Sequence, residues 1–167
     1  MKFYSPALII LCCFAASCSS NSVQDEEALF ENEETTIEEK NLVITAAETE
    51  LFSQVNDYRV ENGLKELAFS PETYKYAEEH TQFMIGENSV SHDNFNDRAS
   101  QIAAETGATQ VAENVAKDYT EVTLALEGWL QSDVHKSTIE GDYTHTAIAI
   151  RENSKGKLFY TQIFLKK

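Results

Sequence analysis

The residues of this chain that could do chemistry are a few histidines and one glutamate in an apolar setting. Glu113 lies inside the short apolar run Val111–Val115, where a carboxylate is costly to bury unless it is paired or hydrogen-bonded. His92 lies in a polar stretch, and His135 follows Ser132 by three residues. Two neutral imidazoles and a carboxylate can hold a divalent cation such as zinc with one position open. The same three groups can equally form a metal-free hydrogen-bonded cluster, so both interpretations stay open.

Other polar residues near these positions have simpler structural explanations. Ser132 could act as a nucleophile beside His135, but capping a helix explains it better. We expect His80 to pack outside the site and Arg98 to form a salt bridge that fixes its own helix. The sequence contains no phosphate-binding glycine loop, Gly-x-Ser-x-Gly elbow, Cys-x-x-Cys pair or His-Glu-x-x-His motif. Binding is therefore favoured over catalysis.

Caps and apolar stripes predict the helices that must position these residues. The first begins at Thr45, which forms a capping box with Glu48, and the second begins at Ser70, followed by Pro71. Gly86 is expected to end the second helix. The four predicted helices cover about residues 45–62, 70–86, 95–105 and 118–130.

Apolar and β-branched segments predict three strands, at residues 111–115, 144–150 and 158–165. The last two strands form a hairpin, and large side chains on both parities of the final strand indicate that both sheet faces are covered. Helices followed by an antiparallel hairpin predict a layered α+β domain over residues 45–167.

The N-terminal segment predicts export. Residues 1–18 have the layout of a secretory signal peptide, with Lys2, a short apolar run and small residues before Cys18. The run is too short to span a bilayer. Small residues directly before Cys18 resemble a bacterial lipobox, so we expect lipid on Cys18 to anchor the protein to a membrane. All three cysteines lie in this segment, so the rest of the chain can form no disulfide.

Residues 19–44 are expected to form a disordered acidic linker, because eight acidic residues face a single lysine and large apolar side chains are few. The predicted domain is also acidic, and the whole chain has a net charge of −15. Nucleic-acid binding is excluded as a function, since it requires clustered Lys and Arg.

Several short motifs follow one another over the whole predicted domain: Leu51–Arg59, Ala77–His80, Ser91–His92, Phe95–Arg98, Ala112–Ala116, Trp129–Ser132 and Tyr160–Phe164. This series resembles the bacterial form of the CAP superfamily, also called SCP, which is named after cysteine-rich secretory proteins, antigen 5 and pathogenesis-related 1 proteins. The resemblance implies a three-layer α-β-α sandwich, with a small antiparallel sheet between helices and a cleft on one face.

In well-known members of that family the cleft holds two histidines and two glutamates, which can take a divalent metal, often zinc. The resemblance implies that His92 and Glu113 are the first histidine and the first glutamate, and that His135 matches a histidine of bacterial relatives. Ser132 stands in place of the second glutamate, and Asp142 stands near the second histidine of eukaryotic members. No cofactor is required of this reduced site, although the resemblance allows zinc on His92, Glu113 and His135.

The function implied by the resemblance is that of an exported CAP-domain lipoprotein of the bacterial cell envelope, a binding module that holds a small ligand, lipid or glycan in its cleft. One alternative is a metal-assisted hydrolase or peptidase that uses His92, Glu113 and His135. Another is a structural or host-interaction protein with a vestigial cleft. The expected partners are the membrane, through Cys18, and a lipid or glycan ligand.

Lipidation can be tested by replacing the acceptor thiol. Wild-type protein should incorporate a fatty-acid probe during metabolic labelling and partition with membranes, whereas Cys18→Ala should remain unlabelled, because the expected lipid is carried by the thiol of Cys18. Equal labelling of the two proteins would show that Cys18 is not the anchor.

Overall fold

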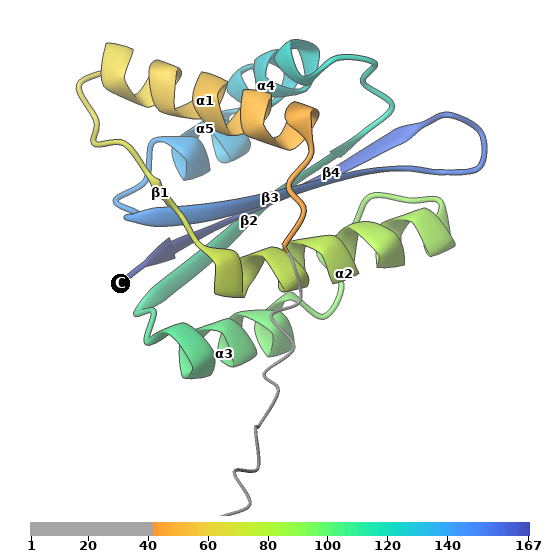
Figure 1. The fold of residues 1–167 in the computed structure, drawn as a ribbon. Helices are drawn as coiled ribbons and strands as arrows, with labels where there is room; N and C mark the ends of the chain where they lie inside the picture. The colour runs from red at the N-terminus through yellow and green to blue at the C-terminus, as the bar shows by residue number, and fades with distance from the viewer. Residues whose placement is uncertain (1–41) are drawn as a thin grey trace, which may run out of the picture. The chain divides into compact units, whose positions relative to one another are not determined.

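A four-stranded sheet lies between two layers of helices in the computed structural model, which describes residues 42–167 (Figure 1). The elements, in chain order, are α1 (Ala46–Glu61), β1 (Ala68–Phe69), α2 (Pro71–Glu87), α3 (Phe95–Thr106), β2 (Gln110–Lys117), α4 (Val122–Leu130), α5 (Asp133–Ile139), β3 (His145–Glu152) and β4 (Leu158–Lys166). The signal peptide, Cys18 and most of the acidic linker lie outside the described residues. Among residues 42–167, no helix is long and apolar enough to cross a membrane.

The strand order in the sheet is β1-β3-β4-β2, with β4 antiparallel to both β3 and β2. The predicted small antiparallel sheet is confirmed, and the structure adds a strand that was not predicted, β1, which pairs with β3 in parallel. The pairing is brief for a local reason. The amide of Ser70 still donates to the carbonyl of Thr146, but Pro71 has no N–H with which to continue the ladder, and α2 begins there.

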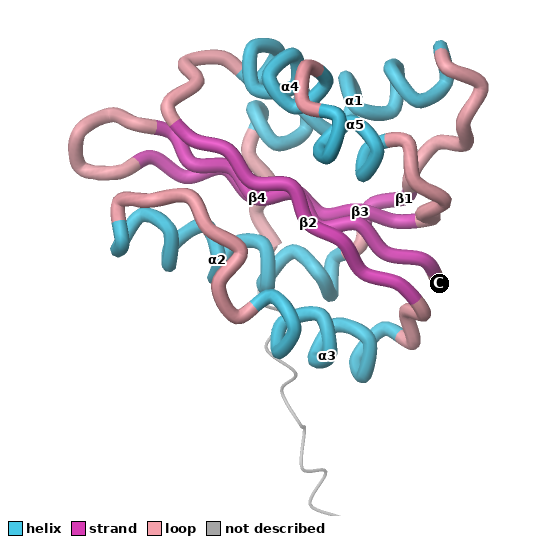
Figure 2. Tube along the Cα trace, turned by 180° about the vertical axis from the view of Figure 1, so that it is seen from behind, coloured by secondary structure: helices cyan, strands magenta, loops and turns pink. Residues whose placement is uncertain are grey.

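Helices cover both faces of the sheet, as the sequence predicted. α1, α4 and α5 lie on one face, here called the α1 face, and α2 and α3 lie on the other, the α2 face (Figures 1 and 2). Side chains of β4 alternate between the two: Tyr160 and Phe164 pack into the core on the α1 face, and Ile163 and Leu165 into the core on the α2 face.

The predicted start of α1 is confirmed. The amide of Thr45 donates to Glu48 Oε2 at 2.7 Å, and the amide of Glu48 donates to Thr45 Oγ1 at 3.2 Å. The second helix begins at Pro71 as expected, but the prediction that Gly86 ends it is wrong. α2 continues to Glu87, and Asn88 adopts the left-handed conformation (φ 49°) that ends the helix.

The predicted start of the fourth helix near Asp118 is also wrong. The amide of Asp118 donates to the carbonyl of Leu158 at 3.0 Å, which extends the pairing beyond the end of β2. α4 therefore begins later, at Val122, with Glu121 at the N-cap.

A buried carboxylate fastens α1 to the neighbouring elements. Glu48 is 1% exposed, and its Oε1 accepts hydrogen bonds from the amide of Ile150 at 2.9 Å and from Arg151 Nη1 at 2.6 Å. The Tyr74 hydroxyl donates to it at 3.0 Å. Since Arg151 also pairs with Glu78, this network joins α1, α2 and β3.

Candidate functional site

Glu113 lies on the edge strand β2 and points toward the α2 face. Adjacent residues of a strand point to opposite faces, and the contacts agree with this alternation. The Glu113 carboxylate meets Arg98 of α3 on the α2 face. The next residue, Asn114, meets α5 on the α1 face, where its Nδ2 donates to the His135 carbonyl at 3.0 Å. The strand therefore directs Glu113 and Asn114 to opposite faces of the sheet.

Arg98 holds both carboxylate oxygens of Glu113. Arg98 Nε donates to Oε2 at 2.9 Å, and Nη2 donates to Oε1 at 2.9 Å and to Oε2 at 2.7 Å. A third nitrogen, Nη1, donates to the carbonyl of Asp93 at 3.1 Å, which fixes the loop before α3. The side chain of Glu113 is only 1% exposed and that of Arg98 is 9% exposed. This forked pair supplies the compensation that a buried carboxylate requires.

His92 uses the same carboxylate to fix its ring. Its Nδ1 lies 2.9 Å from Glu113 Oε1, and since an ionised carboxylate only accepts hydrogen bonds, Nδ1 must carry the proton. The neutral ring then has its lone pair on Nε2. The side chain is 51% exposed, so His92 is the member of the cluster that solvent and ligands can reach.

His80 belongs to this cluster, and the expectation that it lies outside the site is wrong. Its ring is buried on α2, with Nε2 3.6 Å from Glu113 Oε1 and 2.8 Å from the carbonyl of Ser91. The carbonyl can only accept, so Nε2 carries the proton. Burial lowers the pKa of His80 below its ordinary value, and the negative charge of Glu113 opposes this shift only in part. One face of the His80 ring is stacked with the ring of Phe83, at a distance of 5.9 Å between the ring centroids.

The remaining candidates do not join the Glu113 carboxylate. His135 lies on α5, where burial lowers its pKa and the proximity of His92 lowers it further. Ser132 stands at the N-cap of α5, but its side chain makes no capping hydrogen bond, which corrects the capping explanation. Asp142 is exposed and pairs with Lys166. The structure thus unites His92 with Glu113, adds His80 and Arg98, and leaves Ser132 and Asp142 apart.

These donors do not fit a divalent metal ion in their present arrangement. Metal ligation needs free carboxylate lone pairs and neutral imidazole nitrogens converging on one point. Here Arg98 takes both oxygens of Glu113, and His80 donates its Nε2 proton to a carbonyl. Within residues 42–167, no group of three or more His, Cys, Asp or Glu side chains is placed to hold a metal.

Two adjoining hollows flank the cluster between α2, α3 and the loop that joins them. The smaller hollow, about 180 Å³, includes Tyr76, Glu79, His80, Phe83, Asn94, Asp97, Arg98 and Gln101 in its lining. The larger hollow, about 450 Å³, is lined by His92, Asp93, Asn94, Phe95, Asn96 and Asp97. The surface of the larger hollow is mainly polar, whereas the smaller hollow combines polar groups with the aromatic rings of Tyr76 and Phe83. We call these two hollows together the cleft.

The predicted salt bridge of Arg98 is confirmed, with Glu113 as its partner. Sequence reasoning missed the role of His80, although both residues carried a signal of burial. His80 lies three residues after Ala77 and four before Met84, both of which are fully buried, so it shares the buried stripe of α2. Arg98 lies four residues before Ile102, the buried apolar residue of α3. A charged residue on a buried stripe requires a buried partner of opposite charge.

Comparison with known proteins identifies the family of this chain. The model of the cysteine-rich secretory protein family, CAP, matches residues 52–164, which is more than half of the chain. An uncharacterized membrane protein of Bacillus subtilis, YlbC, is 31% identical over 127 residues, which are 74% of this chain and 35% of that protein. The chain thus spans about a third of the length of this curated relative.

Solved structures share the fold. An extracellular protein containing a SCP domain from Bacillus anthracis superposes with a TM-score of 0.64 at 27% identity, covering 72% of this chain and 40% of that one. An outer surface protein of Borrelia burgdorferi superposes with a TM-score of 0.66 at 18% identity, covering 75% of this chain and 96% of that one. The second likeness is one of fold alone.

The buried ion pair predicts a large loss of stability when it is broken. Glu113→Gln removes the negative charge and leaves Arg98 buried without a counter-charge, so the free energy of unfolding should fall by about 3–5 kcal/mol. Adding Arg98→Met should restore part of the loss, because the two residues are coupled. Urea denaturation of the single and double variants measures both effects.

The matched control is the exposed pair Lys75–Glu105, in which Lys75 Nζ lies 2.8 Å from Glu105 Oε2. The two side chains are 52% and 37% exposed. Glu105→Gln should cost less than about 1 kcal/mol, because solvent screens an exposed pair. Equal losses for Glu105→Gln and Glu113→Gln would contradict the buried role of Glu113.

A dependence of stability on pH follows from His80. Since burial lowers its pKa below 6.5, the unfolded chain binds this proton more readily than the folded chain. The stability contributed by neutral His80 is present above the unfolded pKa and is lost as the pH falls below it. The free energy of unfolding should therefore be lower near pH 5.5 than near pH 7.5, and His80→Gln should reduce that difference. A difference unchanged in His80→Gln would assign the titration to other groups, such as His135 and His145, whose pKa values burial also lowers.

Proposed function

This chain belongs to the cysteine-rich secretory protein (CAP) family, and from that premise we propose that it is an exported module that binds a small glycan in the cleft beside Glu113. The signal-peptide layout of residues 1–18 supports export. Relatives named as an extracellular protein and a membrane protein support it as well. Lipid on Cys18 would keep the module at the cell envelope.

The observation that carries the proposal is the fixed orientation of His92. Its Nδ1 is held by Glu113, and Glu113 is held in turn by the fork of Arg98. The ring is therefore preorganised before a ligand arrives, and the ligand does not have to order it. Its Nε2 can accept a hydrogen bond from a ligand hydroxyl at the half-exposed mouth of the cleft.

The lining of the cleft favours a neutral polyol over a lipid. Asn94 and Gln101 offer amide donors and acceptors, and Phe83 offers an aromatic face that is 37% exposed. Glu79 and Asp97 add carboxylates that repel an anionic ligand. A sugar, with many hydroxyls and no charge, matches these groups, whereas an alkyl chain would leave them without partners.

The enzymatic alternative has less support. A hydrolase would need His92 to activate a nucleophile or a metal-bound water. Among residues 42–167, no hydrogen bond joins the Ser132 hydroxyl to an imidazole, and the donors around Glu113 do not fit a metal. If the cleft were vestigial, the exposed imidazole of His92, which Glu113 and Arg98 hold in place, would have no use.

Titration with soluble oligomers of N-acetylglucosamine tests the proposal. The wild-type chain should show saturable binding by calorimetry, and His92→Ala should weaken it at least several-fold, since a lost hydrogen bond contributes about 1 kcal/mol. His145→Ala, at a half-buried histidine of β3 outside the cleft lining, should bind as the wild type does. Absence of saturable binding, or equal binding by His92→Ala, would refute glycan recognition at this cleft.

A further inference from the structure

The smaller hollow of the cleft presents hydrogen-bond acceptors that a ligand contact with His92 leaves unused. It has a volume of about 180 Å³, and its lining includes Glu79, His80, Phe83 and Asp97. Asp97 also lines the larger hollow, which contains His92. A ligand that binds His92 at the mouth can therefore extend into the smaller hollow.

The buried ring of His80 offers one of these acceptors. Because Nε2 carries the proton that is donated to the Ser91 carbonyl, the neutral ring has its lone pair on Nδ1. Within residues 42–167 this Nδ1 accepts no hydrogen bond, although the side chain is only 1% exposed. A buried acceptor without a donor costs free energy. Since the ring lines the hollow, a donor bound there would satisfy this lone pair.

Two carboxylates give the hollow a negative charge. Glu79 of α2 and Asp97 of α3 are exposed, and neither forms an ion pair with another residue in the range 42–167. Arg98 is the cation of this lining, but its charge is balanced by Glu113. The hollow therefore keeps two unbalanced negative charges, which attract a cation and repel an anion.

Phe83 adds an aromatic surface to the same lining. Its ring is stacked with that of His80, and the residue is 37% exposed. A cation over the free face of an aromatic ring is attracted by the negative charge density of that face. An imidazole lone pair, two carboxylates and an aromatic face together match an ammonium group, which has a positive charge and several N–H donors.

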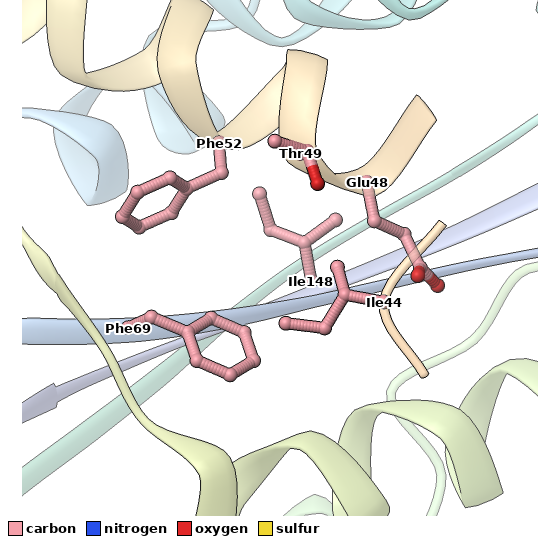
Figure 3. A pocket seen from close by; sticks show the side chains of 6 residues that line it. All are labelled: Ile44, Glu48, Thr49, Phe52, Phe69 and Ile148. Carbon is pink, nitrogen blue, oxygen red and sulfur yellow. The ribbon is translucent and has the colours of Figure 1, made fainter. Parts of the chain in front are cut away.

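The opposite edge of the sheet offers no such match. Figure 3 shows a second pocket there, between the start of α1 and strands β1 and β3. Its polar residues already have partners, because Glu48 is held by Arg151 and by the amide of Ile150, and Thr49 donates to the Thr45 carbonyl. The rest of that lining is hydrocarbon, from Ile44, Phe52, Phe69 and Ile148. An ammonium group is therefore matched in the cleft and not at this edge.

We propose that the glycan of this cleft is an amino sugar with a free ammonium group, and that the ammonium lies in the smaller hollow beside His80, Glu79 and Asp97. This inference rests on the proposed function, since the sugar hydroxyls still bind at His92. It names a de-N-acetylated sugar as the preferred ligand. An N-acetyl group removes the positive charge and leaves one N–H, so it would leave both carboxylates unbalanced.

Calorimetry with oligomers of glucosamine and of N-acetylglucosamine of equal length tests the proposal. The full chain carries Cys18→Ser, so that the expected lipid is absent. At pH 6.5 the amine of glucosamine, comparable to an α-amino group of pKa about 7.7–8.0, is charged. The glucosamine oligomer should bind at least about fivefold more tightly, and about 0.5 M salt should reduce this preference, because it screens exposed charges.

Equal affinities for the two oligomers would overturn the proposal and leave glycan recognition intact. Binding of neither oligomer would overturn both. His92→Ala should weaken both oligomers and keep the ratio of their affinities, so a failure of the His92 contact and a failure of the ammonium site are separable.

A matched pair of double variants locates the ammonium. Glu79→Gln with Asp97→Asn removes both charges and should abolish the preference for glucosamine. Binding of the N-acetylglucosamine oligomer should persist, which also shows that the variant is folded. Asp57→Asn with Glu61→Gln removes the same charges from exposed positions of α1 and should keep the preference. An unchanged preference in the Glu79 and Asp97 variant would refute the assignment.

Nitrogen NMR of His80 gives a readout that the charges alone would not move. The signal of the unprotonated Nδ1 should shift when the glucosamine oligomer binds, because the lone pair then accepts a hydrogen bond. The N-acetylglucosamine oligomer should leave this signal in place. Absence of a shift with glucosamine would remove His80 from the site and contradict the proposal.

Discussion

A carboxylate buried between a sheet and its helices is tolerated only where a cation and several donors meet it, and two glutamates of this fold satisfy that constraint. Glu113 is matched by Arg98, which ties β2 to α3. Glu48 is matched by Arg151, which ties α1 to β3. The first pair joins consecutive elements, and the second joins elements that are distant in the chain. One helix on each face of the sheet, α1 and α3, is thus attached to a strand by an ion pair. Breaking either pair would leave a buried charge without a partner.

The first of these pairs also decides what the cleft can do. Arg98 donates to both oxygens of Glu113, and Oε1 of the same carboxylate also holds Nδ1 of His92. A hydrogen-bond acceptor of fixed direction at a polar mouth is suited to recognition. The substitution of Ser132 for the second glutamate of the family pattern is consistent with that outcome, since the remaining groups satisfy one another.

The strand order places different side chains at the two edges of the sheet. The edge at β2 faces the polar loop between α2 and α3, so the hollow there is lined by amides, carboxylates and one imidazole. The edge at β1 and β3 faces the start of α1, where Glu48 and Thr49 have used their polar atoms on the backbone and on Arg151. The same sheet therefore offers hydrogen bonds at one edge and hydrocarbon at the other.

The sequence by itself determined the features that depend on neighbouring residues: the capping box at Thr45 and Glu48, the terminal hairpin, the order of the family motifs, and Glu113 as a carboxylate that must find partners. Only the tertiary structure decided who those partners are. Strand alternation turned Glu113 toward Arg98 and His80 and turned Asn114 toward the backbone of α5. The parallel β1 and the extension of β2 pairing to Asp118 likewise came from strands distant in the chain. Local patterns set caps and periodicity, but the direction of a side chain and the charge it meets are fixed by packing between distant segments.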